Sequence, residues 1–68
     1  METTLHVPGM NSQEDADRVV FELQDLPCIG VVDVDLAQQT VWIDHTNMIS
    51  VDELQAAVAE AGFPSAPV

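Results

Sequence analysis

The residues best suited to chemistry lie in one short stretch after Gly9. Met10 offers a thioether sulfur, Ser12 a hydroxyl, and Glu14 and Asp15 two carboxylates. Oxygen ligands of this kind suit Mg²⁺, Ca²⁺ or Mn²⁺, whereas soft ions such as Cu(I) prefer thiolate sulfur. A tight Ca²⁺ or Mg²⁺ site needs about six oxygens in fixed geometry, and this loop supplies about three. The stretch therefore predicts no resident cofactor, and at most weak binding of a divalent cation.

The start of a helix explains the same residues without any ligand. Ser12 followed three residues later by Asp15 is similar to a capping box, in which the two residues satisfy free N–H groups of the first turn. The helix dipole favours carboxylates such as Glu14 and Asp15 at this end. We expect this structural role to account for both carboxylates.

Three other candidate ligands are scattered along the chain. Cys28 is the only cysteine, so no disulfide can form within the chain, and an unpaired thiol fits a reducing compartment. About ten residues of helix at ~1.5 Å each should keep it more than ~10 Å from the Gly9 loop, and we expect a half-buried residue there. His6 and His45 match no zinc spacing and are expected at the surface. No histidine is placed to activate Ser12, and the carboxylates have no predicted cleft, so we expect no enzymatic activity.

Alternating hydrophobic periods predict the elements that position these residues. The order is β-α-β-β-α-β, which is typical of an α+β ferredoxin-like sandwich with two helices on one face of a four-stranded antiparallel sheet. Right-handed crossovers place the first and third strands in the middle. The predicted strands cover residues 3–8, 29–36, 41–44 and part of 63–68, and the helices run over 12–26 and 50–61. The predicted core consists of Leu5, Val7, Met10, Val19, Leu23, Val32, Val34, Val41, Ile43, Leu54 and Val58.

Length and charge limit the kinds of partner. Sixty-eight residues are enough for a single domain over 1–68. Twelve acidic residues against one basic residue, a net charge of −11, exclude nucleic acid and anionic membranes and leave cations or basic proteins as partners. The charge also has the simpler role of keeping a small protein soluble. No long apolar run is present, and residues 1–7 lack the pattern of a signal peptide, so we expect a cytoplasmic protein.

Several stretches together resemble a known family. They are Val7-Pro8-Gly9-Met10, Leu26-Pro27, Val32-Asp33-Val34-Asp35-Leu36, Ser50-Val51-Asp52-Glu53-Leu54 and Ala61-Gly62-Phe63. In this order and spacing they are similar to the heavy-metal-associated domain of copper chaperones, mercury-binding proteins and the amino-terminal modules of metal-exporting ATPases. The resemblance covers nearly the whole chain. It implies metal transport or detoxification, with a metal-transporting ATPase as a partner.

The chain departs from the family at the metal motif. The family pattern reads Gly-Met-x-Cys-x-x-Cys, and Ser12 and Asp15 occupy the two cysteine positions here. The family's methionine packs into the core, which is the role we expect for Met10. Because neither a hydroxyl nor a carboxylate replaces a thiolate for a soft ion, we expect soft-metal binding to be weak or lost.

Apolar residues outside the predicted core suggest a second function. Trp42 and Val31 are expected on the open face of the sheet, and Val20 and Phe21 beside the core stripe of the first helix. Aromatic residues are enriched at protein interfaces, although isolated surface apolar residues are also ordinary. The alternative to metal handling is therefore a protein-interaction module that recognises a basic partner through its acidic and apolar surface.

Overall fold

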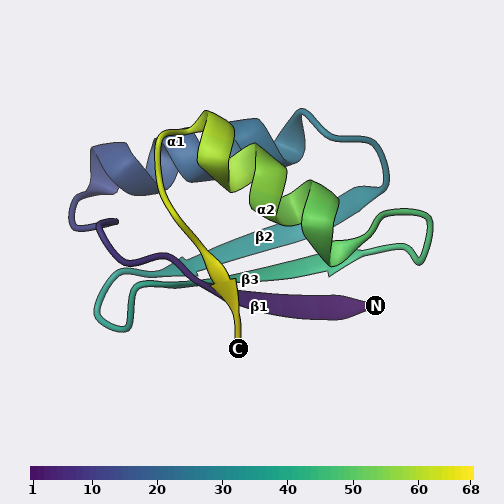
Figure 1. The fold of residues 1–68 in the computed structure, drawn as a ribbon, viewed down its shortest axis with the longest axis horizontal. Coiled ribbons are helices and arrows are strands. Elements are labelled where there is room, and N and C mark those ends of the chain that lie inside the picture. The colour runs from purple at the N-terminus through teal and green to yellow at the C-terminus, as the bar shows by residue number, and fades with distance from the viewer.

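The two helices lie side by side on one face of a four-stranded antiparallel sheet, and the other face is open (Figure 1). The computed structural model describes residues 1–68. The sheet order is β2-β3-β1-β4, so the predicted ferredoxin-like order and the central place of the first and third strands are confirmed. The elements are β1 (Glu2–His6), α1 (Gln13–Gln24), β2 (Ile29–Asp35), β3 (Thr40–His45), α2 (Val51–Glu60) and β4 (Ala66–Pro67).

Each helix begins at a serine cap. Ser12 Oγ accepts a hydrogen bond of 3.2 Å from the Asp15 N–H, and Ser50 Oγ accepts one of 3.3 Å from the Glu53 N–H. These bonds satisfy donors that have no partner inside a helix, as expected for the serine at the start of each predicted helix. Gly62 follows α2 with φ of +98°, a left-handed conformation that ends a helix at little steric cost.

The core lies between the sheet and the two helices. Nine of the eleven predicted core residues are buried, together with the small residues Ala16 and Ala57 and with Ile49. The prediction was wrong in part for Val32 and Val34, which are only half-buried against this cluster. Both lie in β2, which is an edge strand, and α1 leaves part of it uncovered.

Two predictions of exposure, for His45 and for Cys28, were wrong. Both residues lie at the end of the sheet away from the Gly9 loop. His45 is the last residue of β3 and is only 5% exposed, because the alternation of Val41 and Ile43 continues to the same inner face. Cys28 is exposed instead of half-buried. Its φ is +70°, a conformation in which the chain turns sharply from α1 into β2.

Candidate functional site

The loop between β1 and α1 holds the predicted metal-site residues, and its shape follows from Gly9. The φ of Gly9 is +104°, which residues with a side chain rarely adopt. The turn that results lets the Met10 N–H donate to the Val7 carbonyl at 3.3 Å and sends the Met10 side chain into the core, where it is fully buried. The thioether sulfur is therefore not presented at the loop surface, in agreement with the core role expected for Met10.

Ser12 and Asp15 are joined by hydrogen bonds of the helix cap. Ser12 Oγ accepts from the Asp15 N–H, and Asp15 Oδ2 accepts from the Asn11 N–H at 3.2 Å. The capping box is thus reciprocal, with the carboxylate reaching one residue further back than in the usual pattern. Glu14 is exposed and has no hydrogen-bond or ion-pair partner. The arrangement brings Ser12 and Asp15 together and uses both of them structurally.

A second set of bonds ties this loop to the turn between β2 and β3. Asn11 Nδ2 donates to the Gly9 carbonyl at 3.1 Å, and Gln39 Nε2 donates to Asn11 Oδ1 at 2.7 Å. The Val7 N–H also donates to the Gln39 carbonyl at 2.7 Å. Neutral amide bonds therefore hold the loop in place, a network that the sequence pattern did not reveal.

The ligand chemistry of the loop does not match a soft metal ion. No group of three or more His, Cys, Asp or Glu side chains lies close enough to hold a metal. Cys28, the only thiol, follows the far end of α1, whose twelve residues span about 18 Å at the usual rise. What the loop presents at its surface is hydroxyl and carboxylate oxygen, which suits hard cations.

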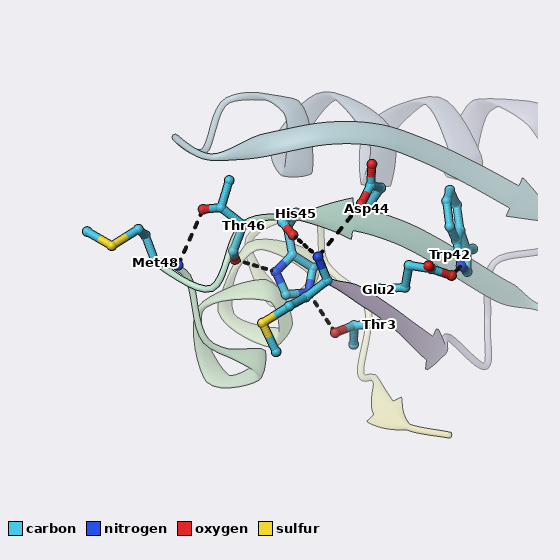
Figure 2. A network of polar contacts seen from close by, with 8 residues as sticks. Glu2, Thr3, Trp42, Asp44, His45, Thr46 and Met48 are labelled. Atoms are coloured by element: carbon cyan, nitrogen blue, oxygen red, sulfur yellow. Dashed lines mark hydrogen bonds and ion pairs between the residues drawn. The ribbon is translucent and has the colours of Figure 1, made fainter.

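The buried polar side chain of the molecule is that of His45, the last residue of β3, at the end of the sheet away from the Gly9 loop. Figure 2 shows its polar contacts. Its Nδ1 lies 2.8 Å from the Thr46 carbonyl, which can only accept, so Nδ1 carries the proton. In the neutral ring, Nε2 then accepts from Thr3 Oγ1 at 2.7 Å. The imidazole is fully satisfied by these bonds, and it joins β1 to the segment that leads into α2. Its role is structural.

The predicted interface residues do not form one surface. Trp42 lies on the open face opposite Thr4 and Asp33, half-buried, with its Nε1 donating to Glu2 Oε1 at 3.2 Å. Val20 lines a groove between α1 and β2, whereas Phe21, 71% exposed, lies on the side of α1 that faces α2.

Val31 is 53% exposed, beside a register irregularity in β2 between Ile29 and Val32. Val20 and Phe21 thus lie in different regions, because consecutive positions of a helix point about 100° apart.

Comparison with solved structures shows which proteins share this fold. Oxidised MerP from Ralstonia metallidurans CH34 superposes with a TM-score of 0.92 at 28% identity, covering 98% of this chain and 94% of that one. The CopZ metallochaperone gives 0.92 at 19% identity, with 97% and 100% covered. A copper-binding domain of HMA7, a P-type ATPase, gives 0.93 at 18% identity, with 98% and 92% covered.

The chain has the heavy-metal-associated fold. The resemblance carried by the sequence motifs is confirmed at this level. No protein-family model matches the sequence, and no curated protein matches it. The likeness is therefore one of fold, in the order of the elements and the topology of the sheet.

Proposed function

We propose that this chain is a domain of the metal transport and detoxification family in which the binding of soft metal ions is weak or lost. One observation carries the proposal: Ser12 and Asp15, in the cysteine positions of the family motif, cap α1 with their polar atoms. The single thiol of the chain lies at the other end of α1. The few oxygens at the surface of the loop are enough for weak binding of a hard divalent cation and too few for a tight site.

The partner that fits this function is a metal-transporting ATPase or another basic protein. The structural neighbours include a metallochaperone and a copper-binding domain of a P-type ATPase, and we infer that this chain likewise handles a ligand or a partner and catalyses no reaction. No helix in the structure has the length and hydropathy needed to span a bilayer. A cytoplasmic site of action agrees with the unpaired, exposed Cys28.

Restoring the two cysteines tests whether only the ligand atoms are missing. Ser12→Cys combined with Asp15→Cys should give tight Cu(I) binding, because thiols at a helix start are favoured as thiolates. Binding is measured by competition with a Cu(I) chelator under reducing conditions, in a Cys28→Ser background. The single variant Ser12→Cys is the control and should bind weakly. A double variant that stays folded and still fails to bind would mean that the resemblance describes fold alone.

A further inference from the structure

The outer edge of the sheet carries a groove, lined mostly by apolar residues, that no part of the chain fills. β2 pairs only with β3, so every second pair of its backbone N–H and C=O groups faces outward. Beside this edge, α1 and β2 enclose a groove of about 420 Å³, with Gln13 and Asp35 at its rim. Its apolar lining consists of Ala16, Val20, Val32, Val34 and Leu36. The half-burial of Val32 and Val34 is the direct consequence of this groove.

The two edges of the sheet differ in what they offer to another strand. β4 has only two residues and includes Pro67, which has no N–H to donate. β2 has seven residues, and it pairs without interruption from Val32 to Asp35. A strand of this length with an open edge is a ready template for pairing with another chain.

The charges on β2 decide which chain can pair there. Asp33 and Asp35 are exposed, and the one ion pair of the structure involves Asp44 and the N-terminal amine, so neither has a cationic partner. Two β2 strands side by side would bring four carboxylates together on molecules that each carry a net charge of −11. Like charges on neighbouring strands are destabilising, whereas opposite charges stabilise the pair. The edge therefore disfavours a second copy and favours a basic strand.

We propose that the β2 edge binds an extended segment of a partner protein in which apolar residues alternate with lysine or arginine. Side chains alternate between the two faces of a strand, so an added strand would point every second residue into the groove, against Val20 and Val34. The residues between them would lie on the open face beside Asp33 and Asp35. Backbone hydrogen bonds to β2 supply affinity, and the alternation of side chains sets the register. This inference does not depend on metal binding.

The test uses a short synthetic peptide in which valine and lysine alternate, titrated into the ¹⁵N-labelled protein. Amide shifts should be largest along β2 and around Val20. A peptide of identical composition, with its valines and lysines in two separate blocks, keeps the charge and loses the alternation, and it should bind much more weakly. A third peptide with glutamate in place of lysine should not bind.

Two pairs of variants locate the site. Val20→Gln should weaken binding about tenfold, because it places an amide in the apolar groove, while Phe21→Gln on the neighbouring helix face should leave binding unchanged. Asp33→Lys should weaken binding about three- to tenfold, whereas Glu60→Lys changes the net charge equally on α2 and should have a small effect.

Three results would overturn the proposal. Equal affinity for the alternating and blocked peptides would show non-specific charge attraction. Shifts confined to the region of Phe21 or to β4 would place binding on another part of the molecule. Concentration-dependent shifts along β2 without peptide would show that a second copy occupies the edge. The shift map is recorded on the unmodified protein, so it decides the question even where a variant is unstable.

Discussion

Replacing Ser12 with alanine is expected to destabilise the protein through the first turn of α1. The substitution removes the Oγ acceptor of the Asp15 N–H, a bond of 3.2 Å. Loss of a serine N-cap costs about 1 kcal/mol. A 68-residue domain has a total stability of roughly 3–10 kcal/mol, so this loss is a sizeable fraction. For a domain of this size it corresponds to a fall in Tm of about 4–8 °C.

Thermal unfolding followed by circular dichroism measures this effect, and the chain supplies its own controls. Ser50 caps α2 through the equivalent hydrogen bond, so Ser50→Ala should lower Tm by a similar amount. Ser12→Asn should retain most of the stability, because asparagine is also a good N-cap. If Ser12→Ala left Tm unchanged while Ser50→Ala lowered it, the cap would not explain Ser12, and the presence of serine at this position of the loop would need another reason.

Three further predictions concern charge and packing. Sodium chloride at moderate concentration should raise Tm, because twelve acidic residues against one basic residue repel one another at distances that salt screens; a flat or falling Tm would show that the charges are too dispersed to matter. Leu54→Ala, at a fully buried position, should cost about 2–5 kcal/mol in urea unfolding, and Val34→Ala about 1 kcal/mol or less; equal losses would place Val34 in the core after all. His45→Ala should cost about 2 kcal/mol or more, because the Thr3 hydroxyl and the Thr46 carbonyl lose their partner, and an unchanged free energy of unfolding would mean that water replaces the ring without loss.

Features set by neighbouring residues could be predicted from the sequence. The caps at Ser12 and Ser50, the glycine that ends α2 and the periods of the strands are local, and together they indicated the order of the elements along the chain. The right-handed crossover rule then predicted the order of the strands in the sheet. Met10 was assigned to the core through the family resemblance, and its complete burial agrees with that assignment.

Features set by tertiary packing could not be predicted in the same way. How much of β2 is covered depends on the position of α1, so the half-burial of Val34 had no sequence signal. The burial of His45 had a sequence signal, because His45 continues the alternation of Val41 and Ile43. Its backbone, however, pairs with Met1, and this pairing extends β3 by one residue beyond the predicted end. The side-chain hydrogen bond between Gln39 and Asn11 joins residues 28 positions apart, and a local sequence pattern carries no information at that separation.

The central claim is that the chain keeps the heavy-metal-associated fold without a soft-metal site. Its most direct test is a Cu(I) competition titration of the unmodified protein against a chelator under reducing conditions, beside Cys28→Ser to account for the exposed thiol. We predict that the chelator keeps the metal, since Ser12 and Asp15 present oxygen and are engaged in the helix cap. Stoichiometric binding that survives the chelator, unchanged by Cys28→Ser, would contradict the account.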